Sequence, residues 1–170
     1  SHALALELWA TNIHEARILA SLVDEPQALT REQMEAWAAD FDSWDVCDQV
    51  CTNLFGPHPL ATEMALAWPH RPEEFVRRAG FVLMAVQAVH RKDLPDAAFE
   101  PYFDLMVQYA DDGRNFVRKA VNWALRQIGK RNPALRERAI ATARQMLEIE
   151  SSSARWIARD ALRELESPAR

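Results

Sequence analysis

The residues best suited to chemistry in this sequence are an indole and a carboxylate, Trp44 and Asp48, which lie four positions apart. On an α-helix this spacing places the two side chains next to each other on one face. Ser43 or Asp42 can cap such a helix, but Asp48 lies beyond the capping region. We therefore expect its carboxylate to face a groove, because in the core it would need a buried partner.

A cation, Arg78, and a second indole, Trp123, follow in later segments whose sequence pattern is similar to that of the segment beginning at Trp44. If these segments stack in parallel, both residues converge with the first pair on one concavity. Two indoles, one carboxylate and one guanidinium suit a positively charged, sugar-like transition state beside a phosphate. The alternative is that the tryptophans belong to the core and the aspartate is solvated.

The elements that must position these residues are helices, because apolar residues recur with the helical period. One apolar stripe runs from Phe75 to Val86 and another from Phe116 to Ile128. No stretch alternates apolar and polar residues for long enough to predict a strand. The chain has 170 residues, of which 49% are hydrophobic, so we expect one all-α domain over residues 1–170.

The helical segments also repeat along the chain. The pentapeptide FVRRA at Phe75–Ala79 aligns with FVRKA at Phe116–Ala120, 41 positions later, and WIARD at Trp156–Asp160 follows after another 40. Weaker copies begin at Ile13 and Trp44. Helix pairs with periods of roughly 30–45 residues indicate a HEAT-like solenoid, an α-α superhelix with a concave groove. A generic helical bundle is the less favoured alternative.

Charge is unevenly distributed along the chain, whose formal net charge is −5. Residues 1–70 carry two basic and eleven acidic side chains, whereas residues 71–170 carry eighteen and fourteen. Within residues 114–138, eight basic side chains are balanced by Glu137 alone. Such a helical segment, with Trp123 embedded in it, can face a polyanion, although a solvated helix face has the same composition.

Three segments carry a recognisable combined pattern: WDVCD at Trp44–Asp48, FVRRA at Phe75–Ala79 and FVRKAVNWALR at Phe116–Arg126, the last followed by KRNP at Lys130–Pro133. Together they resemble the AlkD family of bacterial DNA alkylation repair glycosylases. That family's pattern has Trp-x-x-x-Asp, a hydrophobic-x-Arg-Arg-Ala helix and a Lys-Ala-x-x-Trp-x-Leu-Arg helix that ends in Asn-Pro. The segment Glu7–Arg17 also resembles the family's Leu-Trp and Glu-x-Arg region.

The resemblance implies hydrolysis of the N-glycosidic bond of N3- and N7-alkylated purines in double-stranded DNA. Asp48 is then the catalytic carboxylate, Trp44 and Trp123 are the indoles beside the lesion's deoxyribose, and Arg78 contacts a phosphate. The departing base is already cationic, so the carboxylate need only stabilise an oxocarbenium-like sugar and position a water. The family is understood to act without extruding the base into a pocket.

The resemblance further implies that residues 114–138 supply phosphate contacts, with a strong salt dependence of binding. The residues expected to do so are Arg118, Lys119, Arg126, Lys130 and Arg131. The rival hypothesis is a non-catalytic HEAT-like module that binds nucleic acid or a protein partner through the same concave face. The enzyme is favoured, because a bare scaffold gives no reason for Asp48 to coexist with both indoles.

Further expectations concern completeness, cofactors and setting. Family members carry additional N-terminal helices, and we expect this chain to lack them. We expect no cofactor and no metal, because Cys47 and Cys51 suit buried thiols better than a zinc site with the distant His58 and His70. We expect a cytoplasmic setting without membrane contact, because the chain has only two cysteines and neither a signal peptide nor a long apolar run occurs. We expect a monomer, because the groove must admit duplex DNA. The remaining tryptophans are expected to pack in the core or between repeats: Trp9, Trp37, Trp68 and Trp156.

Overall fold

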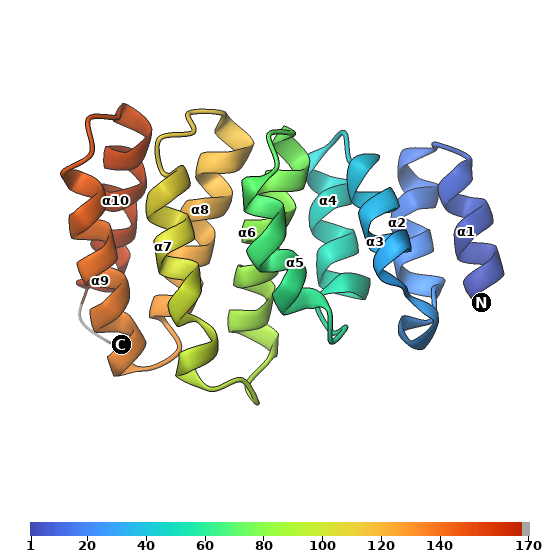
Figure 1. The fold of residues 1–170 in the computed structure, drawn as a ribbon, viewed down its shortest axis with the longest axis horizontal. Coiled ribbons are helices and arrows are strands. Elements are labelled where there is room, and N and C mark those ends of the chain that lie inside the picture. The colour runs from blue at the N-terminus through green and yellow to red at the C-terminus, as the bar shows by residue number, and fades with distance from the viewer. Residues whose placement is uncertain (168–170) are drawn as a thin grey trace.

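The computed structural model describes residues 1–167, which fold into ten α-helices joined by short connections (Figure 1). No strand occurs in this range, so the all-α prediction is confirmed. Residues 168–170, the end of the expected domain, lie outside the described residues. The helices are α1 (His2–Ala10), α2 (His14–Val23), α3 (Arg31–Ala39), α4 (Trp44–Val50), α5 (Ala61–Ala67), α6 (Glu74–His90), α7 (Glu100–Tyr109), α8 (Asn115–Gly129), α9 (Pro133–Leu147) and α10 (Ser152–Leu165).

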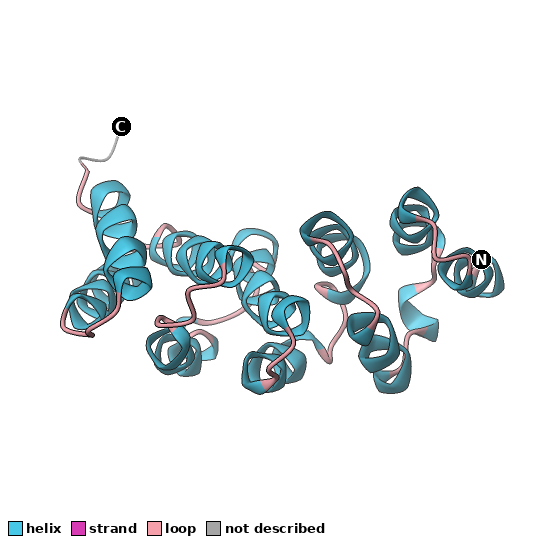
Figure 2. Ribbon diagram, turned by 90° about the horizontal axis from the view of Figure 1, so that it is seen from above, coloured by secondary structure: helices cyan, strands magenta, loops and turns pink. Residues whose placement is uncertain are grey.

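The helices from α2 onwards form two layers, which are seen end-on in Figure 2. The layer of even-numbered helices runs from α2 through α4, α6 and α8 to α10, and α3, α5, α7 and α9 form the other. Figure 2 shows the even-numbered layer bowed, with α2 and α10 displaced away from the second layer. Because each helix packs mainly on its sequence neighbours and on the next pair, the fold is the HEAT-like solenoid predicted from the repeats.

Polar caps determine where several of these helices begin. Ser43 accepts a hydrogen bond from the backbone N–H three residues on, at 3.3 Å, immediately before α4. Ser151 does the same before α10 at 3.1 Å, and Asn132 before α9 at 2.9 Å. Each cap satisfies an N–H that has no partner within its helix. The start of α4, and with it the position of Trp44 and Asp48, therefore follows from a serine cap.

The end of α4 is set by a wider, π-type turn over Cys51–Phe55. In this turn the N–H of Gly56 donates to the carbonyl of Cys51 at 2.7 Å. A Cβ atom at Gly56 would lie 2.6 Å from Cγ1 of Val86 in α6. The absence of a side chain therefore lets the turn lie directly on α6, and this contact holds α4 against the helix that carries Arg78.

Apolar side chains form one core cluster that extends from Ala5 to Leu165. Helix α6 lies at its centre, where every residue from Arg78 to Ala88 is buried. Three tryptophans expected in the core are found there: Trp9 and Trp37 stack with 4.1 Å between ring centroids, and Trp68 is 1% exposed. Across residues 1–167, each helix is too short or too polar to cross a membrane.

Candidate functional site

The Asp48 carboxylate has a direct partner on the neighbouring helix. Arg78 of α6 donates from Nε to Oδ1 of Asp48 at 2.9 Å and from Nη2 to Oδ2 at 2.7 Å. The Asp48 side chain keeps 18% of its surface exposed and that of Arg78 only 9%. Asp48 thus has both a charged partner and an opening to solvent, the two environments in which a carboxylate at this position is stable.

Arg78 also joins a third helix to this pair. Its Nη1 donates to the backbone carbonyl of Phe116 in α8, and its guanidinium carbon lies 6.0 Å from the centroid of the Phe116 ring. Phe75 packs on the same ring with 5.5 Å between centroids. The guanidinium that sequence reasoning assigned to a phosphate is therefore occupied with Asp48 and Phe116, and its contact with phosphate stays a prediction.

The two predicted indoles differ in exposure. Trp44, the first residue of α4, is 50% exposed and lies one helical turn before Asp48. Trp123 is partly buried against the core. It follows Phe116 by seven residues on α8, which is about 10 Å along the helix axis. The structure therefore joins Asp48 to Arg78 beside an exposed Trp44, while Trp123 lies two turns beyond the Arg78–Phe116 contact.

Three of the five cations expected to bind phosphate are engaged within the protein. Arg126 donates to Glu164 of α10 at 2.7 Å, and Nζ of Lys130 lies 2.6 Å from the same carboxylate. Arg131 donates to the carbonyls of Ala88 near the end of α6 and of Leu94 just after it, each at 2.9 Å. These contacts connect repeats. Arg126 and Lys130 share one carboxylate, and Arg131 is held by neutral carbonyls. A role for these three residues in binding phosphate remains a prediction.

The other two cations, Arg118 and Lys119, lie in the first turns of α8. The guanidinium carbon of Arg118 lies 4.6 Å from the ring centroid of Trp156 in α10, a cation–π contact. Lys119 is exposed and forms no ion pair within residues 1–167. Trp156 is only partly buried. It packs between repeats, as expected, but at a surface that cations surround.

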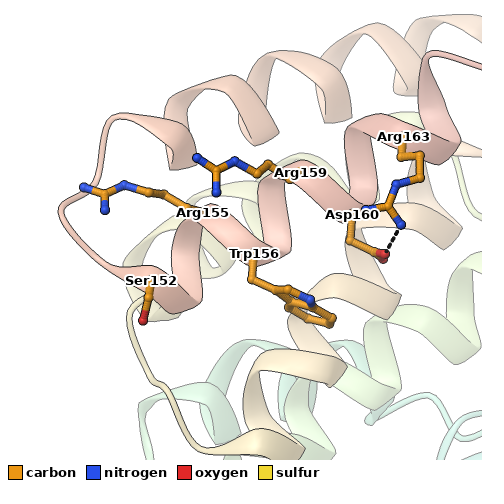
Figure 3. Close-up of a pocket in the computed structure, with 6 residues that line it drawn as sticks. All are labelled: Ser152, Arg155, Trp156, Arg159, Asp160 and Arg163. Atoms are coloured by element: carbon orange, nitrogen blue, oxygen red, sulfur yellow. Dashed lines mark hydrogen bonds and ion pairs between the residues drawn. The ribbon is translucent and has the colours of Figure 1, made fainter.

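Three arginines of α10 were not predicted from the sequence as binding residues: Arg155, Arg159 and Arg163. With Ser152, Trp156 and Asp160 they line a hollow of about 290 Å³, which we call the α10 hollow (Figure 3). The density of basic residues drew attention to residues 114–138, whereas these arginines are separated by neutral and acidic residues. Their spacing of four was the available signal, because it places all three along one side of a helix.

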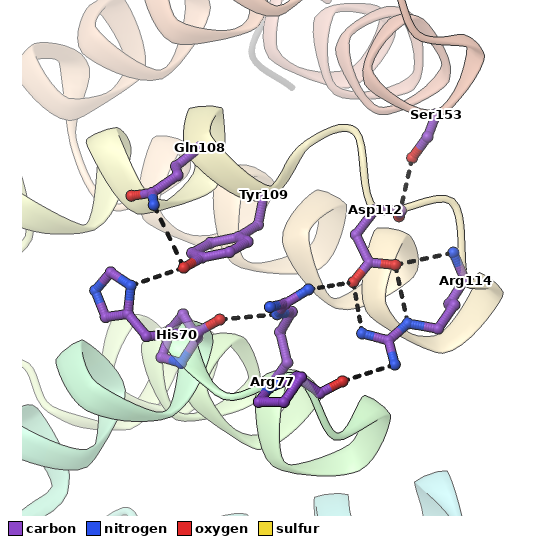
Figure 4. A network of polar contacts seen from close by, with 9 residues as sticks. His70, Arg77, Gln108, Tyr109, Asp112, Arg114 and Ser153 are labelled. Carbon is purple, nitrogen blue, oxygen red and sulfur yellow. Dashed lines mark hydrogen bonds and ion pairs between the residues drawn. The ribbon is translucent and has the colours of Figure 1, made fainter.

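A second cluster of charges, around Asp112, has a structural explanation (Figure 4). Asp112 accepts hydrogen bonds from Arg77 at 2.7 Å and from Arg114 at 2.7 and 3.0 Å. Burial by itself would raise the pKa of Asp112, but the hydrogen bonds from Arg114 and Arg77 lower it to about 2. Ser153 of α10 donates to its backbone carbonyl at 3.2 Å. The cluster therefore ties α6 to α10 through the connection before α8.

The two cysteines are buried, as predicted. Cys47 and Cys51 lie on α4 and in the π-type turn, and neither is bonded to another cysteine. Burial raises the pKa of the Cys47 thiol well above its usual range, which favours the inert, protonated form. In the described part of the chain, no three histidine, cysteine or carboxylate side chains form a group that could hold a metal ion.

Comparisons with known proteins agree with this fold. A family model described as "DNA alkylation repair enzyme" matches residues 1–165. Among solved structures, the chain is similar to one described as "a new family of proteins related to the HEAT-like repeat DNA glycosylases with affinity for branched DNA structures". The TM-score is 0.72 at 19% identity, over 96% of this chain and 75% of the other, which establishes a shared fold. No curated protein matches the sequence significantly.

Proposed function

The chain belongs to the family of DNA alkylation repair enzymes, and from this premise we propose that it is a DNA glycosylase. Its substrates are N3- and N7-alkylated purines in duplex DNA, from which it hydrolyses the N-glycosidic bond. The observation that carries the proposal is the Asp48 carboxylate, which is held by Arg78, partly open to solvent and one turn from an exposed indole. A scaffold helix requires none of these features at its surface.

The chemistry needs little more than a fixed negative charge. Alkylation at N3 or N7 makes the purine cationic, so cleavage of the bond between C1′ and N9 releases a neutral base without a general acid. The sugar is left as an oxocarbenium-like cation, which Asp48 stabilises electrostatically. Water then adds to C1′ and loses its proton to solvent, leaving an abasic site. Arg78 positions the carboxylate for this task.

The indoles complete the proposed site. Trp44 presents its exposed ring beside Asp48, where the electron-rich face favours positive charge developing on the sugar. Trp123 contributes further along α8. Asp48 does not line the α10 hollow, nor the hollow of about 280 Å³ between the π-type turn and the end of α6. We therefore propose that the lesion is approached from the backbone side, without extrusion of the base into a pocket.

Replacing Asp48 with asparagine tests the proposal directly. D48N retains the size of the side chain and an oxygen for Arg78 but removes the negative charge. We expect release of N7-methylguanine and N3-methyladenine from alkylated duplex DNA to fall to near the uncatalysed rate, while the affinity for DNA changes little. D45N is the matched control, since Asp45 lies on the same helix but pairs with His14 at an exposed site. Base release by D48N at the native rate would exclude the assigned role of Asp48.

A second candidate function is a non-catalytic module that binds DNA. The observation that favours it is the structural relative, which is described as having affinity for branched DNA. In addition, both carboxylate oxygens of Asp48 are already hydrogen-bonded. Binding of a four-way junction at least as tight as that of an alkylated duplex, with no release of base by the native protein, would favour this module over the glycosylase.

A further inference from the structure

The α10 hollow contains positive charge that the protein itself does not neutralise. Within residues 1–167, the side chains of Arg155 and Arg159 take part in neither an ion pair nor a hydrogen bond, and Arg159 is exposed. Arg163 pairs with Asp160 at 3.4 Å. Figure 3 shows Arg155 and Arg159 extending from α10 next to each other, while the indole of Trp156 turns toward the neighbouring helices. The hollow therefore presents two unpaired guanidinium groups on a fixed helix.

The acidic groups near the hollow already have partners. Asp160 lies 3.8 Å from Arg126 as well as 3.4 Å from Arg163. Glu164, one turn further on, pairs with Arg126 and Lys130. Arg118 adds a further positive charge above the Trp156 ring. The local excess of charge is therefore positive, and the groups that supply it, unlike Arg126 and Lys130, remain available to an external anion.

A continuous series of contacts connects the α10 hollow to Asp48. Asp48 of α4 is bonded to Arg78 of α6, and Arg78 contacts the carbonyl and ring of Phe116 in α8. Two residues later on α8, Arg118 lies over Trp156 of α10. All of these residues belong to the first two turns of helices in the even-numbered layer. Asp48 and the part of the hollow around Trp156 thus lie toward the same end of this layer, three helices apart.

We propose that Arg155 and Arg159 form a DNA-backbone subsite, in which each neutralises one phosphate of a duplex that extends past Asp48. Neighbouring helix axes lie roughly 8–10 Å apart, so three steps amount to about 24–30 Å. At 3.4 Å per base-pair step, this corresponds to about 7–9 steps from the sugar at Asp48. The subsite binds backbone phosphate and reads no base sequence.

The subsite rests on the proposed function in one respect: the position of the DNA is taken from it, with the modified nucleotide at Asp48. It gives the protein a minimum duplex length for full affinity, which the Asp48 site by itself does not set. The subsite also accounts for an otherwise unexplained feature: within residues 1–167 the arginines without a partner occur on α10, while most cations of residues 114–138 contact acidic or carbonyl groups of the protein.

The test compares two duplex lengths. Each duplex carries one central tetrahydrofuran nucleotide, a stable abasic analogue; the long one has about 25 base pairs and the short one about 9, which ends before the subsite. We expect R155A/R159A to bind the long duplex at least tenfold more weakly than the native protein at low salt. The slope of log K against log [NaCl] should become less steep by about 1.8, at 0.9 per phosphate contact. Binding of the short duplex should be unchanged, which also shows that the variant is folded.

Equal binding of the long duplex by the variant and the native protein would overturn the proposal, as would an equal loss on both lengths. R155K/R159K should restore most of the affinity, because phosphate neutralisation requires charge. R144A is the matched control, since Arg144 is an exposed arginine on α9 in the other layer. Failure of the proposed glycosylase activity gives a different pattern, in which the native protein releases no base but the length-dependent loss in R155A/R159A persists.

Discussion

Arg78 on α6 holds the Asp48 carboxylate on α4 through two parallel hydrogen bonds of 2.9 and 2.7 Å. The same guanidinium donates to the carbonyl of Phe116 on α8. The orientation of the proposed catalytic group is therefore set by three consecutive helices of one layer, and not by α4 alone. A bidentate pair of this kind fixes geometry as well as charge, so a substitution that keeps the charge can separate the two.

Arg78→Lys is such a substitution. Lysine retains the positive charge but lacks the planar fork, so the carboxylate loses one of its two fixed contacts. We expect kcat for base release to fall by roughly 10- to 100-fold, because small displacements of a catalytic group have large effects, while KM for duplex DNA changes little. Steady-state kinetics on alkylated duplex measures both. A raised KM with unchanged kcat would show instead that Arg78 contacts phosphate; R31K, at the exposed Arg31–Glu63 pair, is the control.

The sequence predicted the layer that carries the site unusually well. Repeat copies starting at Ile13, Trp44, Phe75 and Phe116 fall within one residue of the first residues of α2, α4, α6 and α8. The copy at Trp156 starts four residues late, since the Ser151 cap begins α10 at Ser152. An apolar period identifies a helix face, and in a solenoid each face recurs in every repeat.

Partners across repeats were beyond the reach of sequence patterns. Stacking of the repeats predicted that Arg78 converges with Asp48, but the sequence did not show that its guanidinium pairs with the carboxylate. In the same way, the basic count of residues 114–138 could not reveal that Arg126 and Lys130 share the Glu164 carboxylate. Charge pairing between stacked helices depends on their exact register, which composition does not contain.

Arg131→Met tests whether that arginine stabilises the fold or binds phosphate. The native side chain donates to backbone carbonyls at the end of α6 and lies 4.4 Å from the Phe99 ring centroid. Its loss leaves those carbonyls without a charged donor, and we expect a loss of roughly 2–3 kcal/mol in the free energy of unfolding. Urea denaturation measures it. Lys130→Met, which breaks an exposed pair, should lose less than about 1 kcal/mol.

The opposite result for Arg131 would restore the role expected from sequence. If R131M unfolds at the native urea concentration while the salt dependence of DNA binding weakens by about one phosphate contact, then the arginine binds DNA and its contacts with α6 contribute little. Both measurements are made on the same purified variant, so the two roles are separated without reference to catalysis.

Asp112 predicts how stability changes in acid. Hydrogen bonds from Arg114 and Arg77 outweigh burial and lower its pKa to about 2, below the ordinary value of 3.8. Because the folded pKa is the lower one, the unfolded chain binds the proton first. The stabilisation is therefore complete above about pH 4 and is lost as the pH falls toward 2, by at most roughly 2 kcal/mol. Urea unfolding between pH 5 and 2 should show a shallower decline for D112N than for the native protein; parallel declines would contradict this.

Trp44 offers the clearest separation of function from stability. Half of its surface is exposed at the start of α4, so Trp44→Ala removes only about half the buried area of a core tryptophan and should lower the free energy of unfolding by about 1–2 kcal/mol. Its indole is nevertheless proposed to face the sugar cation, a contact worth roughly 0.5–2 kcal/mol in the transition state. We therefore expect base release to slow by about 3- to 30-fold while the melting temperature falls by only a few degrees. Trp37→Ala is the contrasting variant, since Trp37 is 3% exposed and stacks on Trp9. It should lower the free energy of unfolding by about 3–5 kcal/mol. Native rates of release by W44A would remove this indole from the site and leave Asp48 to stabilise the cation by itself.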